Sequence, residues 1–220
     1  MEIKILTLGI TNCYLIKGNQ GYVLVDAGSL RKKRSFLNKL NKLNIKPEEI
    51  KLIVITHAHY DHVGTLKDIK ESCGCPVAIS AHEEAIVAQG RVVIPPGTNL
   101  LGKIISFIGR TFHFVLKFPA VGGEYLVKEE FPLYDYGVKG TVIPTPGHTP
   151  GSLSVILDDG RAIVGDLAMN KPIGNIYPLF AEEPDLVYES WQELIGRGVE
   201  RIYPAHGRSF SIDRIIDRLP

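Results

Sequence analysis

Four side chains that can bind a metal ion lie within six residues, directly after an apolar run. The run is KLIVIT, and the residues that follow it are His57, His59, Asp61 and His62, in the pattern H-x-H-x-D-H. A continuous apolar run of this length is typical of a buried strand. Strand periodicity places His57 and His59 on one side, and a turn can direct Asp61 and His62 to a second point. A tetrahedral catalytic site uses three protein ligands, so four such groups indicate two neighbouring ions.

Three further residues of the same chemical kind follow other strand-like runs. They are His148 in TPGHTPGS, Asp166 in VGD and His206 in YPAHG. Folds that combine helices and sheets place their sites at strand ends, so we expect these residues to join the first four. Imidazole and carboxylate ligands together favour zinc and are also compatible with iron or manganese. His82 and His113 lack this context, and we expect neither to bind a metal.

The composition is that of an ordinary globular chain. It has 220 residues, 45% of them hydrophobic and 22% charged, with a net charge of +1. This balance gives no overall attraction to nucleic acid. Three cysteines are too few for a disulfide scaffold, and the N-terminal segment lacks the long apolar core of a signal peptide. We therefore expect a cytoplasmic protein.

The chain contains a faint internal repeat. From Ile16, a strand, a turn and a second strand lead to Asp26, and the same arrangement leads from Ile156 to Asp166. The repeat predicts two similar halves that face each other, with these aspartates on one rim. Asp26 is either a structural residue at its strand end or a group that orients a ligand imidazole. Separately, Ser80 and Glu83 form a capping-box pattern, which predicts a helix through Ala88.

The ordered motifs THAHYDHVG, TPGHTPGS, GDLA and YPAHG resemble those of the metallo-β-lactamase fold superfamily, and within it the glyoxalase II-like hydrolases. The resemblance implies an α/β fold, an αββα sandwich of two mixed β-sheets flanked by helices, as a single domain over residues 1–220. It also implies the distribution of metal ligands. The first ion is held by His57, His59 and His148, the second by Asp61, His62 and His206, and Asp166 bridges the two ions.

Departures from known subfamilies narrow the expected activity. True β-lactamases of the family lack the bridging aspartate, flavodiiron proteins have a glutamate at the position of His59, and quorum-quenching lactonases have a tyrosine just after the bridge, where this chain has Leu167 to Asn170. Glyoxalase II has a C-terminal extension that helps to hold glutathione, whereas this sequence ends at Pro220. The motifs therefore favour a related hydrolase with another substrate.

The resemblance implies a dinuclear zinc hydrolase with two Zn²⁺ per chain, in which a metal-bridging hydroxide attacks an ester, thioester, lactone or related bond. Asp61 is the expected catalytic residue, because it can orient that hydroxide. Two alternatives are a mononuclear iron oxidoreductase similar to the persulfide dioxygenases and a non-catalytic metal-binding protein. We expect a small-molecule substrate with an apolar portion, and the candidate substrate residues are Lys171, Tyr177 and Arg208.

A hydrophobic helical insertion is expected at about residues 91–123. Between Ala85 and Gly123 there is no Asp or Glu, and Lys103, Arg110 and Lys117 are spaced by seven, which places them on one face of a helix. A transmembrane span here is excluded, because it would separate His57 from His148. The segment could be a core-packed helix, a lid whose Phe107 and Phe112 face the substrate, a membrane-surface contact or a homodimer interface.

Overall fold

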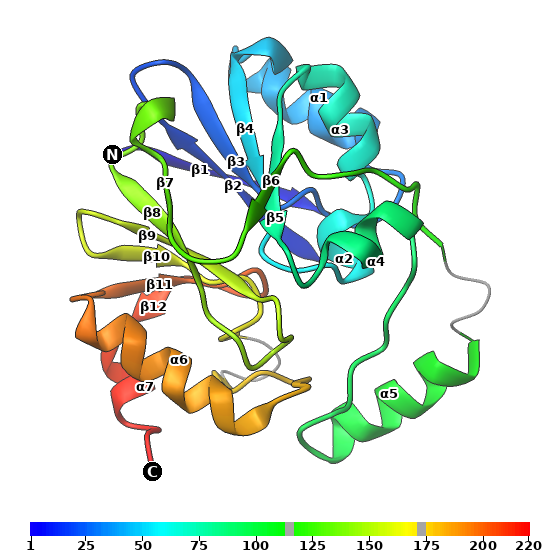
Figure 1. Ribbon diagram of the computed structural model, residues 1–220, viewed down its shortest axis with the longest axis vertical. Helices are drawn as coiled ribbons and strands as arrows, with labels where there is room; N and C mark the ends of the chain where they lie inside the picture. Colours follow the sequence, from blue (N-terminus) through cyan, green and yellow to red (C-terminus); the bar gives the residue numbers. More distant parts are fainter. Residues whose placement is uncertain (113–116, 171–174) are drawn as a thin grey trace.

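Two six-stranded sheets form the centre of the protein in the computed structural model, which describes residues 1–112, 117–170 and 175–220 (Figure 1). The first sheet has the strand order β1 (Ile3–Leu8), β2 (Thr11–Lys17), β3 (Tyr22–Val25), β4 (Ile50–Val54), β5 (Val77–Ser80) and β6 (Tyr125–Val127). The second has the order β12 (Phe210–Ser211), β11 (Arg201–Tyr203), β10 (Arg161–Ile163), β9 (Leu153–Leu157), β8 (Gly140–Pro144) and β7 (Phe131–Pro132). Both sheets combine parallel and antiparallel pairs.

Helices cover the outer faces of the two sheets (Figure 1). The first sheet is covered by α1 (Lys33–Lys42) and α3 (Leu66–Cys73), and the second by α6 (Pro184–Gly196) and α7 (Asp213–Ile216). Shorter segments are α2 (Tyr60–Val63), α4 (Glu84–Gln89), η1 (Pro47–Glu49) and η3 (Tyr134–Tyr136). This arrangement is an αββα sandwich of two mixed sheets, and it confirms the predicted fold class.

The apolar run that precedes the histidine motif is buried on both faces, as its composition predicted. Leu52 and Val54 contribute to the core between the two sheets. Ile53 and Ile55 contribute to the core beneath α1, where they join Phe36. Successive side chains of a strand point to opposite faces, so a strand buried on both sides needs apolar residues throughout. The histidine motif begins directly after this interior strand and is itself buried.

The internal repeat corresponds to two halves with the same strand pairing. In the first half β2 pairs antiparallel with β3, which pairs parallel with β4. In the second half β9 pairs antiparallel with β10, which pairs parallel with β11. Asp26 and Asp166 follow the middle strand of each set, and His57 and His206 follow the third strand. The sequence prediction of two similar halves is therefore confirmed.

Helix α5 (Leu100–Phe112) lies apart from the other helices, at the lower right of Figure 1. Its described part ends before Lys117, which instead forms an isolated bridge with Arg91. The prediction that Lys117 shares a helix face with Lys103 and Arg110 was therefore wrong. Among the residues that the structure describes, no helix is both long enough and apolar enough to cross a membrane.

Candidate metal centre

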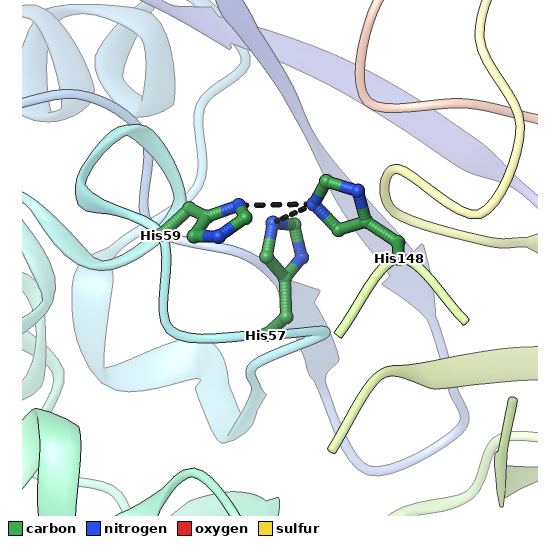
Figure 2. A group of neighbouring side chains, drawn as sticks. All are labelled: His57, His59 and His148. Carbon is green, nitrogen blue, oxygen red and sulfur yellow. Dashed lines mark hydrogen bonds between the residues drawn. The ribbon is translucent and has the colours of Figure 1, made fainter. Parts of the chain in front are cut away.

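Three imidazoles converge at the end of β4 (Figure 2). His57 and His59 lie in the loop after β4, and His148 lies in the loop between β8 and β9. The Nε2 atom of His148 is 3.1 Å from Nε2 of His57 and 2.9 Å from Nδ1 of His59. All three side chains are buried. The two sheets therefore contribute ring nitrogens to one common point.

Burial determines the charge state of this first group. It lowers the pKa of His57, of His148 and of His59, the last to about 3, because a charged imidazole loses its hydration in the interior. Neutral imidazole is the form that binds metal ions. The nitrogens that meet are Nε2 of His57, Nδ1 of His59 and Nε2 of His148. The three residues fit a metal ion that accepts one nitrogen from each of them.

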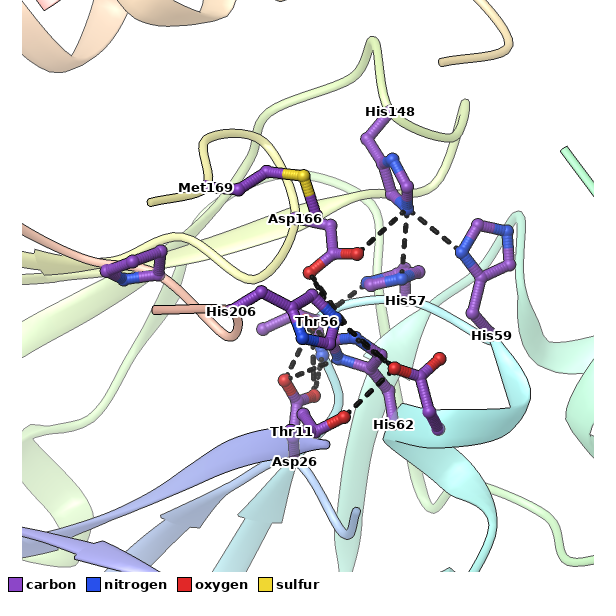
Figure 3. Close-up of polar contacts among 12 residues, drawn as sticks. Thr11, Asp26, Thr56, His57, His59, His62, His148, Asp166, Met169 and His206 are labelled. Atoms are coloured by element: carbon purple, nitrogen blue, oxygen red, sulfur yellow. Dashed lines mark hydrogen bonds and ion pairs between the residues drawn. The ribbon is translucent and has the colours of Figure 1, made fainter. Parts of the chain in front are cut away.

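A second group consists of Asp61, His62 and His206. Figure 3 shows His62 and His206 beside the first group. The Oδ2 atom of Asp61 is 3.2 Å from Nε2 of His206 and 3.8 Å from Nε2 of His62. Asp61 and His62 lie on α2, immediately after the first two histidines, and His206 follows β11. The turn at α2 therefore separates the motif into two pairs, as the spacing predicted.

Asp166 lies between the two groups, with one oxygen toward each (Figure 3). Its Oδ2 is 3.8 Å from Nε2 of His148 in the first group. Its Oδ1 is 3.4 Å from Nε2 of His62 and 3.3 Å from Nε2 of His206 in the second. The Oδ1 atom and Nε2 of His62 are buried without hydrogen-bond partners. This geometry suits a carboxylate shared by two cations.

Carboxylates around the second group give it a negative electrostatic potential. Burial by itself lowers the pKa of His62 and His206, but nearby carboxylates outweigh it. Asp26, Asp61 and Asp166 raise the pKa of His62 well above its usual value, and Asp166 and Asp61 raise that of His206 to about 10. The same negative potential favours a divalent cation, and the donor set of imidazoles and carboxylates fits one.

Outer contacts orient the ligand-type side chains. Oδ2 of Asp26 lies 2.8 Å from Nδ1 of His62, and Oδ1 of Asp26 accepts a hydrogen bond from the Thr56 amide. Nδ1 of His148 lies 2.7 Å from the Phe180 carbonyl oxygen. Such partners set the tautomer and the orientation of an imidazole. For Asp26, the structure therefore favours the orienting role over a purely structural one.

Two residues that support the metal-binding groups were not predicted from the sequence. The buried Thr11 hydroxyl donates to Oδ2 of Asp61 at 3.0 Å, across the gap between β2 and α2. Glu83 does not complete a capping box with Ser80, because its Oε2 accepts the Ala58 amide at 3.1 Å and so supports the loop between His57 and His59. Both contacts join residues far apart in sequence, and no local pattern reveals them.

A cavity of about 930 Å³ opens onto these groups. Its polar lining includes His59, Asp61, Asp166 and His206. Its apolar lining includes Val93, Ile94, Pro95, Ile105, Leu179 and Phe180. A cleft with an apolar wall and a few convergent polar groups is the usual form of a small-molecule site.

The three candidate substrate residues have different positions. Arg208 is exposed and lines the cavity. Tyr177 does not line it, because its ring packs against Tyr188 and Trp191 and its hydroxyl donates to the Pro184 carbonyl at 3.0 Å. Lys171 lies outside the described residues. Of the two histidines not expected to bind metal, His82 is exposed and His113 also lies outside the described part.

Comparison with known proteins agrees with the fold and the site. A sequence profile of the Metallo-beta-lactamase superfamily matches residues 6–206. The chain belongs to this superfamily, and its relatives support a metal-dependent hydrolase. It is 28% identical to the Probable metallo-hydrolase YflN of Bacillus subtilis (strain 168) in an alignment of 228 positions that covers 92% of this chain and 82% of the relative.

Two solved structures show the same fold. The structure of BLEG-1 B3 metallo-beta-lactamase superposes with a TM-score of 0.75 at 21% identity, covering 100% of this chain and 98% of that one. The structure of TTHA1623 in a di-iron-bound form superposes with a TM-score of 0.71 at 24% identity, covering 98% of each chain. At these identities the likeness concerns the fold.

Proposed function

We propose that this protein is a dinuclear metal-dependent hydrolase of the glyoxalase II-like type, with zinc as its native metal. In this proposal the first ion is bound by His57, His59 and His148, the second by Asp61, His62 and His206, and both by Asp166. The observation that carries the proposal is the position of Asp166, whose two oxygens face different groups of imidazoles. A carboxylate between two sets of nitrogen ligands can bridge two adjacent cations.

The ions, when bound, supply Lewis acidity and lower the pKa of water toward 7. The chain's own residues supply position and proton handling. Asp61 orients the attacking water and accepts its proton at a carboxylate oxygen, and the Thr11 hydroxyl holds that carboxylate in place. The wall formed by Ile94, Ile105 and Leu179 excludes bulk water and holds an apolar acyl or aryl group. Arg208, at the rim, provides a positive charge for an anionic substrate group.

The reaction class that fits this site is hydrolysis of an ester, thioester, lactone or related bond in a small molecule. The second group of Asp61, His62 and His206 can hold a second ion, so metal content separates this proposal from the mononuclear iron alternative: two zinc ions per chain against one iron. The choice of zinc rests on the imidazole-rich ligand set. Iron is the main competitor, because a protein of this fold, TTHA1623, has a di-iron-bound form.

Metal analysis of the purified protein, followed by a substrate panel, tests the proposal. We expect two zinc ions per chain, and turnover of at least one ester, thioester or lactone that a chelator abolishes and added Zn²⁺ restores. One iron per chain with sulfur-dioxygenase activity would support the redox alternative instead. Tightly bound metal with no hydrolysis across a broad panel would support the non-catalytic alternative.

A further inference from the structure

Helix α5 presents the opposite of the usual amphipathic arrangement. A surface helix normally packs its large apolar residues on the protein and exposes its polar ones. In α5, five large apolar side chains are between 48% and 76% exposed: Leu100, Leu101, Ile104, Phe107 and Ile108. We refer to these five residues as the outer face of α5. An exposed apolar surface of this kind marks an interaction site.

Small residues make the contact between α5 and the rest of the protein. Ser106 is buried, and its hydroxyl donates to the Pro95 carbonyl at 2.6 Å. A Cβ atom at Gly102 would clash with the Leu179 carbonyl oxygen, and one at Gly109 would lie 3.1 Å from the Ile94 side chain. Gly102, Ser106 and Gly109 are three or four residues apart, so they form one face of the helix. Close packing through this face directs the outer face away from the protein.

The outward orientation of the apolar face of α5 decides between the alternatives given for residues 91–123. Only Ile105 and Gly109 of α5 line the cavity among the described residues. Phe107 is 76% exposed and is not part of the cavity wall, so the expectation that it faces the substrate was wrong. The Phe112 side chain lies outside the described part. The contact through small residues also excludes a helix packed in the core by its large side chains.

The charged residues of α5 itself are both positive. Lys103 and Arg110 are exposed on one flank of α5, and Arg110 also donates through Nε to the Ile94 carbonyl at 3.4 Å. No Asp or Glu occurs between Ala85 and Gly123. An apolar helix face flanked by Lys and Arg is the composition of helices that lie in the interface of anionic membranes.

We propose that the outer face of α5 lies on the surface of an anionic lipid bilayer. Phe107, Leu100 and Ile104 enter the boundary between headgroups and acyl chains, and Lys103 remains at the level of the lipid phosphates. The helix lies flat in this arrangement and does not cross the bilayer. Its neighbour Ile105 lines the cavity, so binding also places this part of the cavity wall near the lipid. The proposal concerns binding and is independent of the catalytic activity.

A second copy of this chain is the competing occupant, and charge disfavours it. Packing two outer faces about a twofold axis would bring Lys103 and Arg110 of each copy together. Residues 85–123 supply no carboxylate to offset the two copies of Lys103. An anionic surface instead offers a phosphate partner to each cation.

Co-sedimentation with vesicles tests the proposal. The probes are vesicles of phosphatidylglycerol and phosphatidylcholine in equal parts, and vesicles of phosphatidylcholine alone. We expect binding to the anionic vesicles that weakens with added salt, and weaker binding to the neutral ones. The double substitution Leu100→Ser with Phe107→Ser should lower the partition constant at least about tenfold. Lys103→Gln should lower it about fivefold.

A matched control uses Ile216→Ser, because Ile216 is 46% exposed on α7 and Ile104 is 51% exposed on α5. Ile104→Ser should weaken vesicle binding and Ile216→Ser should not. Absent binding by the unaltered protein, or equal losses for both substitutions, would overturn the proposal. So would a dimer in solution that the double substitution dissociates, because the outer face would then be an interface between copies. All substituted residues are exposed, so circular dichroism should show an unchanged fold.

Discussion

The Nδ1 atom of His62 lies 2.8 Å from Oδ2 of Asp26, and Asp26 itself adopts a left-handed backbone conformation with φ of 64°. Few residues other than glycine adopt this conformation, although Asp and Asn tolerate it better than most. Asp26 comes directly after β3, and its Oδ1 also accepts a hydrogen bond from the Thr56 amide. The end of β3 therefore has a backbone shape that delivers one carboxylate to one imidazole.

Asp26→Asn tests this relationship. Asparagine retains the backbone conformation but removes the charge that orients His62. We expect metal affinity at the group of Asp61, His62 and His206 to fall about 10- to 100-fold, with the other group less affected. Competition with a chromogenic chelator measures both affinities. Asp68→Asn, at a carboxylate partly exposed on α3, is the control and should change neither. Equal affinities in Asp26→Asn and the unaltered protein would contradict the orienting role.

Asp166→Asn should weaken both metal sites at once, because a neutral amide is a poor bridge between two cations. We expect activity to fall by about 100-fold or more. Elemental analysis of metal content, paired with turnover of the best substrate from the panel, provides the measurement. Retention of both ions together with most of the turnover would show that Asp166 does not bridge.

Thr11→Val should reduce kcat with little effect on metal content. The substitution removes the hydroxyl that donates to Asp61, and a hydrogen bond to a charged acceptor is worth about 1.5–3 kcal/mol. We therefore expect kcat to fall about tenfold or more, and Thr11→Ser to restore most of it. If Val and Ser gave the same kcat, the contact would be merely structural.

Ile105 and Ile104 are neighbours on α5 with different surroundings, which makes them a matched pair. Ile105 lines the cavity and Ile104 belongs to the outer face. Ile105→Ala should lower kcat/KM about tenfold for substrates with a long apolar chain and about twofold or less for short ones. Ile104→Ala should leave both unchanged in detergent-free solution without lipid. A uniform loss across chain lengths would indicate that Ile105 does not contact the apolar group.

Removal of the metal should destabilise the fold. A ligand present at about 100 times its Kd stabilises the native state by about 2.7 kcal/mol, and without it the buried Nε2 of His62 and Oδ1 of Asp166 have no hydrogen-bond partner. We expect a chelator to lower the thermal midpoint by several degrees and added Zn²⁺ to restore it. An unchanged midpoint would indicate that the centre is empty under those conditions.

The sequence predicted the fold class and the group of converging residues because these depend on local patterns. The apolar run KLIVIT predicts a strand that is buried on both faces, as observed. The motif residues His57, His59, Asp61 and His62 are close together in the sequence, so their proximity in space was expected. Their assembly with His148, Asp166 and His206 required the ordered motifs, since spacing alone does not reveal which strand ends are neighbours. Tyr177 shows the limit of this reasoning, because its ring packs, partly buried, against Trp191 of α6 and does not line the cavity.

The remaining errors have one physical origin, which is contact between distant segments. The hydrogen bond from Thr11 to Asp61 and that from Ala58 to Glu83 join separate elements, and hydrogen bonding to a tertiary partner displaced the local cap expected of Glu83. The orientation of α5 was hidden in the same way. Its apolar content is obvious, but only the contacts of Gly102 and Ser106 show which face points inward.

The centre draws its residues from both halves of the chain, and this makes it a reporter of their assembly. His57, His59, Asp61 and His62 precede β6, whereas His148, Asp166 and His206 follow β7. Hydrogen bonds join the two halves. The Asn12 backbone amide donates to the Ala205 carbonyl at 2.9 Å, and the Tyr14 hydroxyl donates to the Pro204 carbonyl at 2.6 Å. If the chain were cut between β6 and β7, neither fragment would carry a complete ligand set. Tight metal uptake would then signal that two separately made fragments had found each other, as in a split-protein sensor.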